Sequence, residues 1–177
     1  SDLSITSGGV LTFKSAPDYE TRSSYSATVT ASDGANSTNQ SITVSVTNVN
    51  EAPIFSSASS FSADENQLNV GTVTATDPEG DALTFSVSSS DLVMSSSGVL
   101  TFATAPDYET KSSYTGTIAV TDGSLITTQA VAITVLDVNE APIFTSSAAF
   151  SADENQTGIG TVTATDPEGD ALTFSVS

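Results

Sequence analysis

The sequence of 177 residues contains no histidine, cysteine or tryptophan, and only three basic residues stand against 21 acids. With a formal net charge of −18, the chain lacks the cationic surface that binding to nucleic-acid phosphates requires. Without imidazole or thiol it also lacks the usual general base and nucleophile of enzymes, and the usual ligands of zinc. The absence of cysteine excludes a disulfide scaffold.

Long hydrophobic runs are also missing. Nothing approaches about 18 consecutive apolar residues, so the sequence predicts no membrane-spanning helix and no membrane insertion. No signal peptide is visible, which is expected for an internal piece of a longer protein. Serine and threonine fill most of the polar positions that are not acidic.

An internal repeat organises what is present. Glu51 recurs as Glu140, an offset of 140 − 51 = 89 residues, and the same offset pairs all six prolines and all eight phenylalanines. Ten pairs of acids recur as well, and Asp137 alone lacks an acidic counterpart, because Asn48 occupies the matching position. Retention of every proline and phenylalanine at one spacing indicates an internal duplication.

The local patterns within each repeat are those of short strands. Apolar residues alternate with polar ones, which predicts half-buried strands of about five to seven residues; the alternating sets are Val73 and Ala75, then Leu83, Phe85 and Val87, then Tyr114, Ile118 and Val120, then Val131, Ile133 and Val135. Turn signals such as Asp77-Pro78-Glu79-Gly80 and Asp122-Gly123 separate these segments. About seven strands in about 90 residues predict an all-β, immunoglobulin-like β-sandwich.

The register of the repeat predicts three parts. Residues 1–48 correspond to the second part of a repeat, residues 49–137 to a complete repeat, and residues 138–177 to the first part of the next. One interpretation is a window from a long array of repeats. The other is that identical chains join head to tail, each donating half a sandwich to the next, because an incomplete sandwich leaves strand edges and core exposed.

The acids gather at strand ends instead of scattering over the surface. In a sandwich the loops at strand ends collect at the two poles, so acids distant in sequence can converge there. Carboxylates that meet without lysine or arginine repel one another, and a hard cation with oxygen ligands removes that cost. Calcium accepts six to eight oxygens in irregular geometry, whereas magnesium keeps its waters, so the pattern favours Ca²⁺.

Five strings together carry a family resemblance: VLDVNEAPIF, ADEN, TATDPEGD, APDYE and VTDG. In combination they resemble the cadherin repeat in its bacterial cadherin-like form, over the whole chain in permuted register. The resemblance implies tandem Greek-key β-sandwiches with calcium ions in the short linker between successive repeats. In that family one domain supplies a glutamate near its first strand and a D-x-E motif, the linker supplies D-x-N-D-N, and the next domain supplies a D-x-D turn and a later aspartate.

Matched position by position, the resemblance assigns ligands to two junctions. The second junction, near residue 139, takes the following residues: Glu65, Asp107, Glu109, Asp137, Asn139, Glu140, Asp166 and Glu168. The first junction, near residue 50, takes these: Asp18, Glu20, Asn48, Asn50, Glu51, Asp77, Glu79 and Asp122. The first glutamate of that junction would precede Ser1.

Some of these positions depart from the family pattern. Glu79 and Glu168 stand where the family usually has aspartate, and Glu51 and Glu140 replace the linker aspartate. Asn48 keeps an oxygen but loses a charge, so we expect the first junction to bind its ions more weakly than the second. Asp2 and Asp91 are interpreted as ordinary loop acids.

These observations predict a non-catalytic, calcium-rigidified structural or adhesive extension module of a long bacterial protein, outside the cell or on its surface. The expected partners are neighbouring repeats of the same chain or identical chains end to end, together with a cell-surface or matrix ligand. The first alternative is a subunit of an extracellular filament that assembles head to tail through its split repeats.

Three further alternatives are weaker. A carbohydrate-binding module usually offers exposed aromatic residues, and here each aromatic fits a repeated core or pole position. A glycoside hydrolase could use paired carboxylates such as Asp107 and Glu109, but the pair is duplicated in both repeats. A merely solvated acidic surface explains the sign of the charge but not its clustering.

Overall fold

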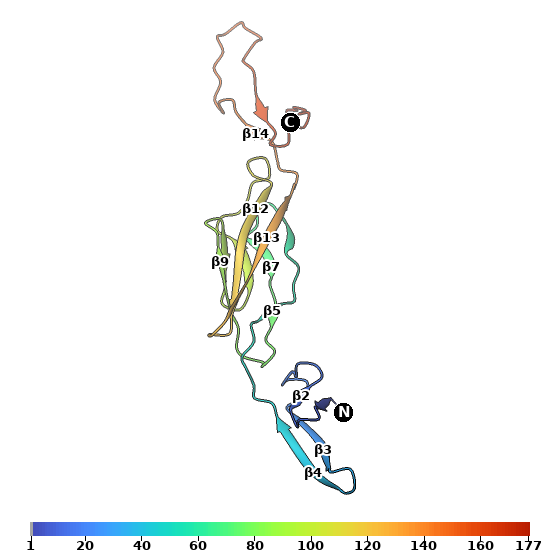
Figure 1. The fold of residues 1–177 in the computed structure, drawn as a ribbon. Helices are drawn as coiled ribbons and strands as arrows, with labels where there is room; N and C mark the ends of the chain where they lie inside the picture. The colour runs from blue at the N-terminus through green and yellow to red at the C-terminus, as the bar shows by residue number, and fades with distance from the viewer. Residues whose placement is uncertain (1) are drawn as a thin grey trace.

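The computed structural model describes residues 2–177, which form strands, turns and irregular segments without a helix. Figure 1 shows an extended molecule with three parts in a row. The chain runs from an N-terminal segment through a central sandwich to a C-terminal segment at the far end. No helix among the described residues could cross a membrane. The all-β fold predicted from the sequence is thus confirmed.

The central sandwich is built from two main sheets and a small third one. The four-stranded sheet has the order β6 (Ser60–Asp64), β13 (Ile126–Leu136), β12 (Ser113–Thr121), β9 (Thr84–Ser88), with β6 parallel to β13. The three-stranded sheet has the order β10 (Leu92–Met94), β11 (Val99–Phe102), β7 (Asn69–Thr72). The two strands of the third sheet are β5 (Ile54–Phe55) and β8 (Ala75–Thr76).

Period-two alternation creates the core between the sheets. In the second half of both β12 and β13 every second residue is buried, including Ile118, Ile133 and Val135. They meet Leu100 and Phe102 from the opposite sheet in one hydrophobic cluster. Full burial of a side chain of this size contributes about 1.5–3 kcal/mol. This core therefore fixes the positions of the loops at both poles.

One glycine, in the turn between β10 and β11, is required beside the point where the chain crosses from β7 to β8. Gly98 has φ +91°, and its carbonyl accepts a 2.8 Å hydrogen bond from the Val73 N–H. A Cβ on Gly98 would lie 2.3 Å from the Val73 carbonyl oxygen. A side chain at this position would clash with the backbone of Val73, and the positive φ also favours glycine.

The two end segments contain fewer strands than the sandwich. The N-terminal segment pairs β1 (Leu3–Ile5) with β2 (Leu11–Phe13), and β3 (Ser24–Ser32) with β4 (Ser37–Ser45). At the repeat offset these strands correspond to β10–β13. The C-terminal segment pairs only β14 (Ile143–Phe144) with β15 (Ala164–Thr165), the counterparts of β5 and β8. The division of the chain at residues 48/49 and 137/138 stays a prediction.

Strand lengths differ from the prediction of five to seven residues. β12 has nine residues and β13 has eleven, because the two strands pair with each other along nine consecutive positions. The strand expected through Val73 and Ala75 is interrupted, since β7 ends at Thr72 and β8 begins at Ala75. The chain changes sheets there, and the buried Val73 lies at the crossing.

Candidate metal sites at the two linkers

The second junction is organised around one buried carboxylate. Glu65 follows β6 directly and its residue is only 3% exposed. One carboxylate oxygen accepts a 2.7 Å hydrogen bond from the Tyr108 N–H, and the other accepts a 2.8 Å bond from the Val138 N–H. Charge-assisted bonds of this kind compensate for the burial of the carboxylate. Glu65 thus ties the end of β6 to the loop before β12 and to the linker.

Carboxylates from both sides of the linker converge on Glu65. One oxygen each of Glu65, Glu109, Asp137 and Glu168 lies within 4.8 Å of the others. Glu168 comes from the turn after β15, so the following segment contributes to the group. Its Oε1 accepts a 3.1 Å bond from the Glu140 N–H, while its Oε2 is buried without a hydrogen-bond partner.

The electrostatics of this group are unfavourable without a counterion. Desolvation raises the pKa of Glu168, with its backbone bonds opposing and Asp166 adding to the rise. For Glu109, a bond to its own backbone lowers the pKa, but desolvation and repulsion from Glu65, Asp137 and Glu168 outweigh it and leave the pKa raised. A raised carboxyl pKa means that this environment disfavours the ionised form.

Asn66 is a member of this junction that the sequence reasoning missed. It adopts φ +62°, a conformation that asparagine tolerates better than most residues, and its N–H donates to the Pro106 carbonyl at 2.9 Å. Its side-chain amide donates a 2.7 Å bond to the Glu140 carboxylate. The recurrence of Asn66 as Asn155 in the ADEN string was the signal that could have found it.

The first junction repeats this arrangement with fewer acids. Oxygens of Glu20, Glu51 and Glu79 lie within 4.8 Å of one another. The Glu51 N–H donates a 3.2 Å bond to Oε2 of Glu79, whose Oε1 is buried without a partner. Desolvation raises the pKa of Glu20, and the nearby Glu79 and Glu51 add to the rise.

Two further predicted residues of the first junction are held in place by amides. Oδ1 of Asp77 accepts 3.1 Å bonds from the N–H groups of Glu79 and Asp81, whereas its Oδ2 is buried without a partner. Asp122 accepts a 2.8 Å bond from the side-chain amide of Asn50. That bond is the main reason for the lowered pKa of Asp122, followed by the backbone N–H groups of Leu125 and Ser124.

Other predicted site residues lie outside the two groups. Both oxygens of Asp107 accept bonds from Thr110, and Asp18 does the same with Thr21. Asp166 accepts the Asp170 N–H, and the Asn139 side chain donates to the Glu140 carbonyl. Asn48 lines an open hollow at the first junction. The role of every one of these residues as a ligand stays a prediction.

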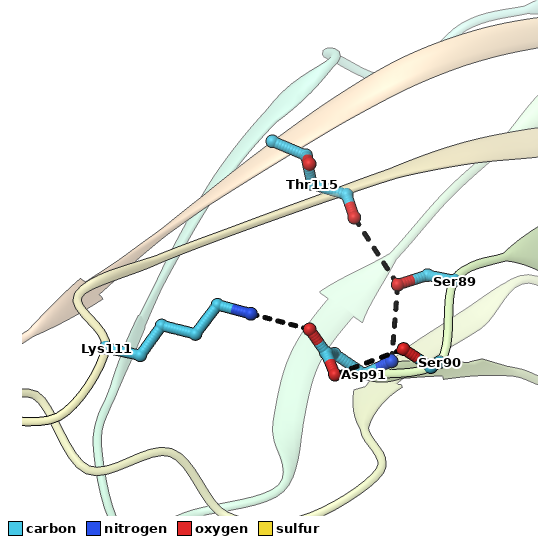
Figure 2. Close-up of polar contacts among 5 residues, drawn as sticks. All are labelled: Ser89, Ser90, Asp91, Lys111 and Thr115. Atoms are coloured by element: carbon cyan, nitrogen blue, oxygen red, sulfur yellow. Dashed lines mark hydrogen bonds and ion pairs between the residues drawn. The ribbon is translucent and has the colours of Figure 1, made fainter.

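Two of the three basic residues form ion pairs away from the linkers. Figure 2 shows Lys111 directed at Asp91, with 2.6 Å between the charged atoms, beside hydrogen bonds that involve Ser89, Ser90 and Thr115. Arg22 and Asp2, at the matching positions, form a second ion pair at 2.7 Å. These are the ion pairs of residues 2–177, and both use the acids interpreted as loop acids. Neither one neutralises a linker group.

The arrangement fits a hard cation. Each junction offers several carboxylate oxygens at short mutual distance, and each includes at least one buried oxygen that accepts no hydrogen bond, on Glu79 and on Glu168. Buried carboxylate oxygens without partners are costly, and a cation would relieve both the missing bond and the repulsion. An all-oxygen donor set of mixed carboxylates and amides matches the chemistry of calcium.

Comparison with known proteins finds a matching family model and a relative with a similar sequence. Residues 50–134 match the sequence model of a family described as bacterial Ig domain. Chitinase A of Pseudoalteromonas piscicida is 32% identical over 137 residues, which are 76% of this chain and 17% of that protein. The chain therefore spans about a sixth of the length of this relative.

Solved structures of cadherin domains are similar in fold. The structure of human CDH23 EC21-23 has a TM-score of 0.62 at 22% identity, covering 94% of this chain and 61% of the other. The protocadherin GammaB4 extracellular domain has a TM-score of 0.55 at 26% identity, covering 93% of this chain and 30% of the other. The similarity extends over the end segments as well as the central sandwich.

Proposed function

We propose that this chain, whose residues 50–134 match the bacterial Ig domain model and whose fold is similar to that of cadherin domains, is a non-catalytic extension module whose linkers are stiffened by calcium. It serves in a long bacterial protein at or outside the cell surface, where it provides length and a defined direction. The fold is that of structural and adhesive modules, and the calcium and the stiffness are the parts that the proposal adds.

The observation that carries the proposal is the sharing of carboxylates across each linker. At the second junction Glu65 and Glu109 come from the sandwich, Asp137 from the end of it, and Glu168 from the following segment. A cation held by all of them would bridge two repeats, so bending the linker would require breaking coordination. The buried, partnerless Oε2 of Glu168 supports an ion at this place.

Without the ion the same group would act as a loose hinge. The linker Val138-Asn139-Glu140-Ala141-Pro142 is short and contains no flexible glycine-serine run. The acids facing each other across it repel, and no lysine or arginine of residues 2–177 forms an ion pair with them. We therefore expect a straight, stiff rod in calcium and a wider range of bend angles in chelator.

The proposal of a non-catalytic role rests on composition. The chain has no histidine or cysteine, and the acids that converge lie at the two linkers. The match to 17% of a chitinase supports a stretch of a larger protein, not a self-contained enzyme.

The test is calorimetric titration with calcium, with magnesium as the comparison cation. Extracellular calcium modules often bind with dissociation constants of about 10⁻⁴ to 10⁻³ M. We expect Asp137→Asn to weaken binding at the second junction, while the matched control Asp64→Asn, a neighbouring exposed acid outside both groups, leaves it unchanged. Equal weakening by both variants would show that bulk charge attracts the ion, and no binding at all would refute the proposal.

A further inference from the structure

The loop between β11 and β12, residues 103–112, carries contacts that organise the second junction. Glu109 supplies one oxygen of the acidic group, and the Tyr108 N–H binds the buried carboxylate of Glu65. Both residues lie in a segment that forms no strand. Backbone pairing within a sheet therefore does not fix their positions, and other contacts have to hold this loop.

Asp91 binds both ends of the loop. Its backbone carbonyl accepts a 2.8 Å hydrogen bond from the Ala103 N–H, and its carboxylate lies 2.6 Å from the ammonium of Lys111. Figure 2 shows how Asp91 is itself held: its N–H donates to the Ser89 hydroxyl at 3.3 Å, and that hydroxyl donates to the Thr115 carbonyl at 3.4 Å. The beginning and the end of the loop are thus tied to one residue that is connected to β12.

An aromatic contact connects this ion pair to the core. The Lys111 ammonium lies 4.2 Å from the centre of the Tyr114 ring, a distance at which a cation and a ring face attract each other. The Tyr114 ring packs edge-on against Phe102, with 5.0 Å between the ring centres, and Phe102 is buried in the core. Asp91, Lys111 and Tyr114 together form a loop clamp that is anchored on the sandwich.

The same clamp recurs one repeat earlier with a different cation. Arg22 pairs with Asp2 at 2.7 Å and lies 4.2 Å from the centre of the Tyr25 ring. That ring packs against Phe13 at 5.0 Å, and the Asp2 carbonyl accepts the Lys14 N–H at 2.9 Å. Two of the three basic residues of the chain therefore occupy this one position of the repeat. The exchange of lysine for arginine keeps both the ion pair and the ring contact, which indicates that the position requires a cation.

We propose that the loop clamp positions residues 103–112 for the cation at the second junction. Asp91 and Lys111 do not belong to the acidic group. They act through the loop, by holding Glu109 and the Tyr108 N–H in place. A loop that is already ordered does not have to be ordered when the ion binds, so binding is tighter. The role at the metal rests on the proposed calcium function, whereas the ordering of the loop does not depend on it.

Charge alone predicts a different result from positioning. Loss of Lys111 removes a positive charge from a loop that carries two acids, so by charge alone it would strengthen calcium binding. Loss of the negative charge of Asp91 would weaken it by the same argument. If the clamp positions the loop, both losses weaken binding, because either one opens the clamp. Lys111→Met therefore separates the two explanations.

Calcium titration of the 177-residue chain, followed by nuclear magnetic resonance, measures the two junctions separately. The amide signals of Glu109 and Asp137 report the second junction, and that of Glu79 reports the first. Lys111→Met keeps an aliphatic stem and loses the charge. We expect it to raise the dissociation constant of the second junction about threefold or more and to leave the first unchanged. Asp91→Asn is expected to weaken the second junction as well.

Two control variants test whether the clamp itself is responsible. Lys111→Arg installs the residue found at position 22 and is expected to retain the wild-type affinity, because arginine forms the same contacts there. Lys14→Met makes the same chemical change at the basic residue whose side chain lies outside both clamps, and it is expected to leave the second junction unchanged. In chelator we expect faster amide hydrogen exchange at Tyr108 in Lys111→Met, with exchange at the buried Ile118 unchanged as evidence of an intact fold.

Unchanged or tighter calcium binding by Lys111→Met overturns the role of the clamp at the metal, while the proposed calcium function stands. Equal weakening by Lys111→Arg and Lys111→Met overturns it too, because arginine keeps the contacts of the clamp. A wild-type chain that binds no calcium refutes the proposed function and, with it, the role of the clamp at the metal. Unchanged exchange at Tyr108 in chelator overturns the ordering of the loop by the clamp.

Discussion

Replacement of Glu65 by glutamine isolates the structural contribution of the buried carboxylate. Both oxygens of Glu65 accept backbone N–H groups, of Tyr108 at 2.7 Å and of Val138 at 2.8 Å. Glutamine keeps one acceptor and turns the other into a donor that faces an N–H. A buried donor left without a partner costs about 1–3 kcal/mol. Relief of repulsion with Glu109, Asp137 and Glu168 opposes this loss in chelator but not in calcium.

We therefore expect Glu65→Gln to lower the free energy of unfolding by about 1–3 kcal/mol in calcium, and by less in chelator. Each kcal/mol corresponds to about 4–8 °C in the unfolding midpoint of a domain of 60–100 residues. Thermal unfolding followed by circular dichroism measures the effect, with the adjacent exposed Asp64→Asn as the control of equal charge change. If the two variants lose the same stability, or if Glu65→Gln loses more in chelator than in calcium, the assignment of Glu65 is wrong.

Three other predictions concern the junctions. Asn48→Asp is expected to raise the calcium affinity of the first junction toward that of the second, as measured by calorimetric titration; no change would contradict its place near the ion. The pKa values of Glu109 and Glu168 are raised in the folded state, so their ionisation lowers the free energy of unfolding at neutral pH. In chelator the free energy of unfolding should therefore rise as the pH falls from 7 toward 4.5, the ordinary pKa of a glutamate. The stabilisation that calcium adds should shrink over the same range. Asn66→Ala removes the 2.7 Å bond to Glu140 and should widen the distribution of bend angles in small-angle scattering even in calcium; an unchanged distribution would exclude a positioning role.

The sequence predicted the parts of the site that lie next to regular strands. The strand-end positions of the acids predicted that some of them converge at one pole, and the structure brings Glu65, Glu109 and Asp137 together. Their selection as ligands came from the resemblance to the cadherin repeat and stays a prediction. Glu168 and its counterpart Glu79 were assigned from the resemblance to the cadherin repeat, whose following domain supplies ligands from this turn. Strand ends and turn signals thus predict the convergence of acids at a pole, whereas the resemblance was needed to select individual residues.

Other features depended on contacts that no local pattern encodes. Asn66 contributes through a positive φ and a bond to a residue 74 positions away, so its neighbours in sequence reveal neither. The length of β13 follows from its pairing with β12, which continues as long as the two strands stay together. Alternation marks which residues face the core, but pairing decides where a strand ends.

The two copies of TFSVS separate local propensity from pairing in a single molecule. At residues 84–88 the copy pairs with β12 and its backbone N–H groups are held in the sheet, whereas at residues 173–177 the same side chains form no strand. The two copies have the same intrinsic strand propensity because their sequences are identical. A difference in their amide hydrogen exchange therefore reports the presence or absence of the partner strand. We expect strong protection at Phe85 and little at Phe174 in dilute wild-type protein, measured residue by residue by nuclear magnetic resonance. If Phe174 is as protected as Phe85, the segment is protected without a partner strand, and the reasoning from pairing fails.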